Sequence, residues 1–190
     1  TEWITFLDID AFFLLKNIDN IEKFMHDFQK NHAVYFNWSM FGTKSFDKRP
    51  EGSVLSNYFY REEALHPLTK VISKTNIYSD QWISEIPKDS FHHGISNLFL
   101  DFDCVNVIGD KINNIIKDDF GKFIDYQSEY LVDKSNDIRE VAVVNHYFMK
   151  SKEDFIRRWQ RSVNNTFSGQ KIWKDAFDSG RYKDIIKLSN

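Results

Sequence analysis

Short apolar runs separated by polar clusters predict a succession of strands along the chain. Residues 3–7 (Trp-Ile-Thr-Phe-Leu) form a continuous apolar, β-prone run that stops at an aspartate, which is typical of a short buried strand. The region that includes Arg49-Pro50-Glu51-Gly52 predicts a loop over residues 42–53. Similar apolar runs predict strands over residues 33–38, 68–73, 97–107 and 141–148.

Apolar positions at helical spacing predict the helices. From Ile21 to Phe28 these positions recur every three or four residues, and Asp19 or Asn20 can cap a helix over residues 20–31. Ser151, followed by two acidic residues, resembles a capping box that opens a helix through position 159. Weaker helical spacing occurs over residues 111–124 and 172–188.

The order of these elements predicts an α/β fold. Strand, helix and strand follow one another over residues 3–38. A length of 190 residues fits one domain or part of a larger one. Because the chain begins with Thr1 and enters a strand almost at once, we expect it to start within a longer protein.

Composition and charge argue against several classes of protein. A net charge of -3 provides no basic field for a nucleic-acid backbone, so we expect no nucleic-acid partner. The single cysteine, Cys104, cannot form an internal disulfide, which favours a cytoplasmic location. No apolar run approaches the roughly 18 residues of a membrane span, so we expect a soluble protein or one at the inner membrane face. The basic and aromatic residues 157–161 favour a solvated helix face over membrane contact.

Asp8-Ile9-Asp10 is the candidate chemical motif. Two carboxylates one residue apart at the end of a strand can point from a tight turn toward one hard cation, Mg²⁺ or Mn²⁺. Such a cation can bridge two phosphate oxygens and neutralise a leaving diphosphate. An isolated pair is more often solvated charge, and Asp101-Phe102-Asp103 is a second copy of the same pattern.

Three blocks of the sequence resemble known glycosyltransferases. Residues 3–10 with Phe12-Phe13 resemble the "W-I-x-F-L-D-x-D-E-F" block of family 2-like and family 92 glycosyltransferases. Trp38, Phe41-Gly42, Arg49-Pro50, Gly52 and Arg61 are similar to their "W-x-x-F-G … R-P-x-G … R" segment, and residues 146–155 to their "H-Y-x-x-K-S-x-E-x-F" block. The resemblance covers residues 2–70 and 140–162, in the right order.

The resemblance implies a fold and an activity. The fold would be of the GT-A type, a mixed sheet flanked by helices, with residues 1–190 forming its catalytic domain or the acceptor-side, C-terminal portion, and with the nucleotide-binding part upstream. The activity would be an inverting, metal-dependent transfer of a hexose from a nucleotide-sugar, expected to be a UDP-sugar, to a saccharide or lipid-linked glycan. The cofactor would be Mn²⁺ or Mg²⁺, and polysaccharide biosynthesis would be the setting.

The same resemblance implies a role for each candidate site residue. Asp8, Asp10 and His146 would hold the metal, and Lys150 would join the two aspartates in binding the donor diphosphate. On residue type alone, His146 could equally be a buried histidine at a strand end, and Lys150 a surface charge. The acceptor side would be formed by Trp38, Arg49 and Arg61, although Trp38 is more typical of a packing residue.

Ala11 departs from the family pattern, and no general base is singled out by the sequence. Ala11 stands where the family has glutamate, which puts full activity in doubt without affecting the fold. An inverting transfer also needs a general base, which we leave unassigned. The candidate carboxylates are Asp80, Glu85, Asp89, Asp101 and Asp103.

Two other functions fit parts of the pattern. An apolar strand ending in D-x-D also opens haloacid-dehalogenase-like phosphatases, and Gly109-Asp110 imitates their late Gly-Asp motif. Against this reading, Asn113-Asn114 offers no carboxylate for the metal. A non-catalytic binding domain derived from a transferase is the other alternative, and it is motivated by Ala11.

Overall fold

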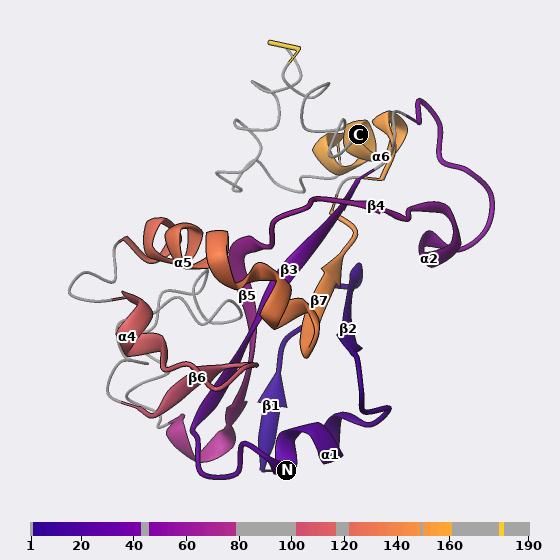
Figure 1. Ribbon diagram of the computed structural model, residues 1–190. Helices are drawn as coiled ribbons and strands as arrows, with labels where there is room; N and C mark the ends of the chain where they lie inside the picture. Colours follow the sequence, from indigo (N-terminus) through magenta and orange to yellow (C-terminus); the bar gives the residue numbers. More distant parts are fainter. Residues whose placement is uncertain are drawn as a thin grey trace. The chain divides into compact units, whose positions relative to one another are not determined.

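The chain folds as a mixed α/β protein built on one sheet. A computed structural model describes residues 2–42, 46–78, 102–116, 122–148, 150–160 and 179–180 (Figure 1). The described residues divide into two compact units, one made of those that fall in 1–39 and 64–145 and the other of those that fall in 40–63 and 146–190. Each unit is described by itself.

The described residues contain seven strands. Five follow the order β1 (Trp3–Thr5), β5 (His66–Lys74), β3 (Ala33–Gly42), β7 (Ala142–His146) and β2 (Ala11–Leu15), while β6 (Cys104–Asn106) and β4 (Tyr60–Arg61) both pair with β3. The pairing is mixed, because β5 is antiparallel to both β1 and β3, whereas β6 is parallel to β3. Strand β3 lies at the centre, and all ten of its residues are buried.

Burial of β3 follows from covering on both faces of the sheet. Successive side chains of a strand point to opposite faces, so Tyr35 and Phe36 enter different layers. Tyr35 packs in a cluster with Val71 and Phe123, whereas the Phe36 ring lies 4.8 Å from Phe13 of β2. A strand covered on both faces is expected to be apolar throughout, as residues 33–36 are.

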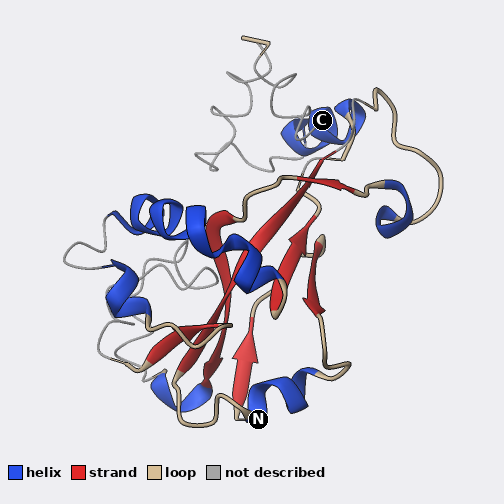
Figure 2. Cartoon of the chain, viewed as in Figure 1, coloured by secondary structure: helices blue, strands red, loops and turns tan. Residues whose placement is uncertain are grey.

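Helices supply the covering layers (Figure 2). On the Tyr35 face, α5 (Phe123–Arg139) packs against β5 and α4 (Ile112–Ile116). On the Phe36 face, α1 (Ile21–His26) places the Phe24 ring 5.7 Å from Phe36, and Asn20 caps this helix by accepting hydrogen bonds from the backbone N–H groups of residues 22 and 23. A single 3-10 turn, η1 (Thr75–Ile77), follows β5.

The second unit has its own small aromatic cluster. Phe41 and Tyr147 stack with ring centroids 4.7 Å apart, and Tyr58 is buried beside them. Two helices belong to this unit, α2 (Val54–Asn57) and α6 (Lys152–Gln160). Ser151 begins α6 as its cap, because its Oγ accepts a hydrogen bond of 3.0 Å from the Asp154 N–H.

The predicted elements compare closely with the structure in most places. The α/β class is confirmed, as are the strands at β1, β3, β5 and β7 and the capped helix α6. Helix α1 ends at His26 rather than at residue 31, and strand β2 was not predicted. Of the strand expected over residues 97–107, the structure has Cys104–Asn106, while residues 97–101 and the helices expected over 172–188 lie outside the described residues, apart from 179–180.

Within the described ranges, no helix is both long and apolar enough to cross a membrane.

Candidate metal and diphosphate site

A tight turn between β1 and β2 carries the D-x-D motif. The Ala11 N–H donates a 3.0 Å hydrogen bond to the Asp8 carbonyl oxygen, which closes a four-residue turn. The middle residue, Ile9, is 99% exposed, whereas Asp10 is 9% exposed. The turn therefore directs its apolar side chain to water and its second carboxylate toward the protein.

His146 meets the two aspartates. It is the last residue of β7, a strand whose other residues belong to the first unit, and it is 2% exposed. Ligand atoms of Asp8, Asp10 and His146 all lie within 4.8 Å of one another. The fold thus brings an imidazole to two carboxylates that lie more than 130 residues before it in the sequence. These three residues are the ones predicted as metal ligands.

This set of donors suits a first-row divalent ion. Carboxylate oxygens bind Mg²⁺ and Mn²⁺, and a neutral imidazole is compatible with Mn²⁺. Within the part of the chain that the structure describes, Asp8, Asp10 and His146 are the group of three His, Cys, Asp or Glu residues that could hold a metal. The fit is chemical, and the presence of a cation stays a prediction.

A buried lysine that was not predicted from the sequence joins the motif. The Nζ atom of Lys70, in the middle of β5, lies 2.9 Å from Oδ2 of Asp8, and the Lys70 side chain has no exposed surface. The sequence contained a signal for it, since Lys70 places a charge within the β-prone stretch of residues 68–72 (Leu-Thr-Lys-Val-Ile). A charge inside a buried strand needs a partner, and here the partner is the first aspartate of the motif.

The register of the sheet explains how Lys70 reaches Asp8. Lys70 lies directly opposite Phe36 on β3, so the two side chains share the face of the sheet covered by α1. Strand β1 pairs with β5 as far as Thr5, opposite Ile72. Because β1 ends there, the chain that follows can turn and place the Asp8 carboxylate over the next same-face position of β5, which is Lys70.

Trp38 belongs to the packing around this lysine. Its side chain is 6% exposed and stacks on His66 with ring centroids 5.6 Å apart. The Lys70 Nζ atom lies 5.7 Å from the centroid of the Trp38 ring. Trp38 thus has the surroundings of a core residue, and its assignment to an acceptor sugar stays a prediction.

Arg49 connects two of the blocks that carried the family resemblance. Its guanidinium forms an ion pair with Asp154 of α6, and its backbone N–H donates a 3.1 Å hydrogen bond to Oε2 of Glu153. The contact with Asp154 raises the pKa of the guanidinium, which is charged at neutral pH in any case. These contacts hold the loop of residues 46–50 to the beginning of α6, which is a structural role for Arg49.

Arg61 and Lys150 also belong to the second unit. Arg61 lies on β4 with an exposed side chain, and Nη1 donates a 3.5 Å hydrogen bond to the carbonyl oxygen of Glu62. Lys150 precedes the cap of α6 and is partly exposed. Their expected roles toward acceptor and donor stay predictions.

The second D-x-D copy and the phosphatase-like Gly-Asp pair each have an aspartate held by contacts with other side chains. Asp103 accepts a 3.1 Å hydrogen bond from Asn31 and lies 3.3 Å from the Lys111 ammonium. Asp110 sits in a turn in which Gly109 adopts φ 88°, and it accepts a hydrogen bond from the Tyr130 hydroxyl. Neither aspartate belongs to the three-residue group that could hold a metal among the described residues.

The remaining candidates for the general base lie outside the described residues. These are Asp80, Glu85, Asp89 and Asp101.

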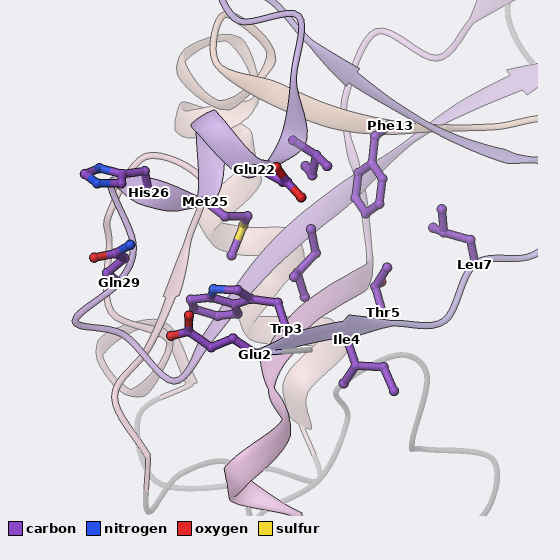
Figure 3. Close-up of a pocket in the computed structure, with 12 residues that line it drawn as sticks. Glu2, Trp3, Ile4, Thr5, Leu7, Phe13, Glu22, Met25, His26 and Gln29 are labelled. Carbon is purple, nitrogen blue, oxygen red and sulfur yellow. The ribbon is translucent and has the colours of Figure 1, made fainter.

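An apolar pocket lies on the α1 side of the first unit (Figure 3). Its volume is about 780 Å³, and side chains from β1, β2, β5 and α1 line it, among them Trp3, Phe13 and Met25. Asp8, Asp10 and His146 are not among its lining residues. The apolar pocket and the group of Asp8, Asp10 and His146 are therefore separate features.

Comparison with protein-family models, with curated proteins and with solved structures finds no match to this chain.

Proposed function

We propose that this protein is a metal-dependent glycosyltransferase that takes a hexose from a nucleoside-diphosphate sugar. The observation that carries the proposal is the meeting of Asp8, Asp10 and His146, whose ligand atoms lie within 4.8 Å of one another. The site consists of two aspartates in a turn after a strand and a histidine from a strand far away in the sequence. These residues offer the oxygen and nitrogen ligands that a diphosphate-bound cation requires.

The chain's own residues would act by holding charge in place. Asp8 and Asp10 offer oxygen ligands and His146 a nitrogen ligand, and Lys70 fixes one oxygen of Asp8 at 2.9 Å. When bound, a divalent cation supplies charge neutralisation for a leaving diphosphate. The burial of Asp10 and His146 restricts water around the ligands, which strengthens their attraction for a cation.

The family resemblance supports the remaining parts of the proposal. It favours a GT-A fold, a UDP-sugar as donor, Lys150 on the donor phosphates and a saccharide or lipid-linked glycan as acceptor. For the acceptor side, exposed Arg61 is the stronger candidate, because Trp38 is buried and Arg49 is engaged with α6. A cytoplasmic location, with or without contact at the inner membrane face, accords with the single cysteine.

Release of UDP from a panel of UDP-hexoses with Mn²⁺ tests this proposal. We expect slow hydrolysis of at least one donor, lost with EDTA and reduced at least 100-fold by Asp10→Asn. Release of phosphate from p-nitrophenyl phosphate in place of UDP would instead favour the phosphatase alternative. Mn²⁺-dependent binding of UDP without turnover of any donor would favour the non-catalytic alternative, which is motivated by Ala11 at the position where the resembled family has glutamate.

A further inference from the structure

We infer that Lys70 makes cation binding and diphosphate binding depend on each other, an inference that rests on the proposed function. Its ammonium is enclosed by protein and contacts Oδ2 of Asp8 at 2.9 Å. It therefore places a fixed positive charge against Asp8, one of the two carboxylates that would hold a divalent cation. A surface lysine could swing away from an arriving cation, but a lysine with no exposed side-chain surface cannot.

The charges of the described cluster give the direction of the effect. Asp8, Asp10 and Lys70 together carry one net negative charge, beside the imidazole of His146. A divalent cation meets attraction from both carboxylates and repulsion from the ammonium, so it binds less tightly than to the carboxylates alone. Once the cation is present the cluster is net positive by one charge, which attracts a diphosphate.

Two observations indicate that Lys70 serves to balance charge rather than to fill space in the core. The ammonium contacts the motif aspartate itself, and the centroid of the Trp38 ring lies 5.7 Å from it. Four residues further along the same strand, Lys74 places its ammonium 5.3 Å from the Trp3 ring and donates to the Gln29 carbonyl oxygen, with no carboxylate in either contact. Lys74 is thus a matched lysine on the same face of the same strand, without the motif.

Lys70→Met separates the two roles. Removal of one positive charge near a divalent ion, at separations near 4 Å, changes its affinity more than tenfold even with the dielectric constant of water. We expect Lys70→Met to bind Mn²⁺ alone at least tenfold more tightly than the unchanged protein, and to bind UDP at saturating Mn²⁺ at least threefold less tightly. The mutual enhancement between Mn²⁺ and UDP should fall accordingly. A purely structural role would weaken both affinities or neither.

The experiment measures unbound Mn²⁺ by electron paramagnetic resonance, with and without UDP, for the whole chain and for two variants. Lys74→Met is the control, since it removes the same charge from the same strand and should leave both affinities within twofold. Thermal unfolding checks that each variant is folded, and Lys70→Gln replaces the methionine variant if that variant does not fold.

The outcomes separate the two proposals. If the unchanged protein binds UDP with Mn²⁺ and the folded Lys70 variant shows Mn²⁺ affinity that is equal or lower, the inference about Lys70 is overturned and the proposed function stands. If neither protein binds Mn²⁺ or UDP, both fail. Opposite shifts of the two affinities in the Lys70 variant alone support the inference.

Discussion

The ion pair between Lys70 and Asp8 predicts unequal costs for removing its two members. The Lys70 side chain has no exposed surface, whereas the Asp8 side chain is 42% exposed. Asp8→Asn leaves a buried ammonium facing a neutral amide, which is costly because the ammonium, already withdrawn from water, loses the carboxylate that contacts it at 2.9 Å. Lys70→Met leaves a carboxylate that water still reaches.

The structure sets the size of these costs. Breaking a fully buried pair from one side costs about 3–5 kcal/mol, and a fully exposed pair is worth about 0–1 kcal/mol. Since one partner is buried and the other half-exposed, we expect Asp8→Asn to lower the free energy of unfolding by about 2–3 kcal/mol, and Lys70→Met by about 1 kcal/mol. With methionine already at position 70, Asp8→Asn should cost under about 0.5 kcal/mol, so the coupling energy is about 2 kcal/mol.

Urea denaturation in EDTA at pH 7 measures all four proteins of this cycle. EDTA removes any cation, so that the free energy of unfolding reports the ion pair and not metal binding. Equal costs for the two single variants, or a coupling energy below about 0.5 kcal/mol, would refute the reasoning that Lys70 is buried against Asp8.

Three further predictions test other parts of the structure. Burial raises the pKa of the Cys104 thiol to about 12, so at pH 8 little thiolate is present and Ellman's reagent should react more than about 100-fold more slowly with the folded protein than with the protein in urea. Ser151→Ala removes the cap of α6 and should lower the free energy of unfolding by about 1 kcal/mol in urea denaturation; no change would contradict the cap. Ile116→Val should lower the free energy of unfolding by about 0.5–1.5 kcal/mol, because Ile116 has no exposed surface. The same change at Ile9, which is 99% exposed, should lower it by less than about 0.5 kcal/mol. Equal costs in urea denaturation would contradict the assigned core.

Much of the strand framework could be predicted because covered strands leave a plain apolar signal. Residues 33–36 are apolar on both faces of β3, and β7 is buried almost throughout. Strand β2 was missed because its apolar residues directly follow the motif, with no further turn residue to separate them. It is the last strand in the sheet order, and its side chains alternate between exposed and more buried positions although all five are apolar.

Helix α5 was missed for a different physical reason. Its buried positions recur at helical spacing, but polar residues occupy several of them. Gln127 is polar and so adds nothing to an apolar pattern. Its side-chain oxygen accepts a 3.4 Å hydrogen bond from Asn37 of β3. Ser135 accepts a 3.1 Å hydrogen bond from the Leu65 N–H. Hydrogen bonds to partners far away in the sequence satisfy these buried polar residues. A local sequence pattern does not show those partners.

The candidate site shows the same division. The turn at Asp8 and Asp10 could be predicted locally, because an apolar strand stopped at an aspartate. Placement of His146 beside them rested on resemblance, since it depends on how β7 enters the sheet. Lys70 could be seen as an unusual charge in a strand, but its partner is set by the pairing of β1 with β5. Long-range register therefore decides which charges meet.

Titration of UDP into the protein by calorimetry tests the central claim most directly. The measurements are made with Mn²⁺, with EDTA, and with Mn²⁺ on Asp10→Ala, with thermal unfolding to show that the variant is folded. We predict binding that requires Mn²⁺ and disappears in the variant, because Asp10 is one of the three residues whose ligand atoms meet. The absence of binding by the folded protein under all conditions, or binding that is equal with EDTA, would contradict a metal-dependent diphosphate site at Asp8, Asp10 and His146.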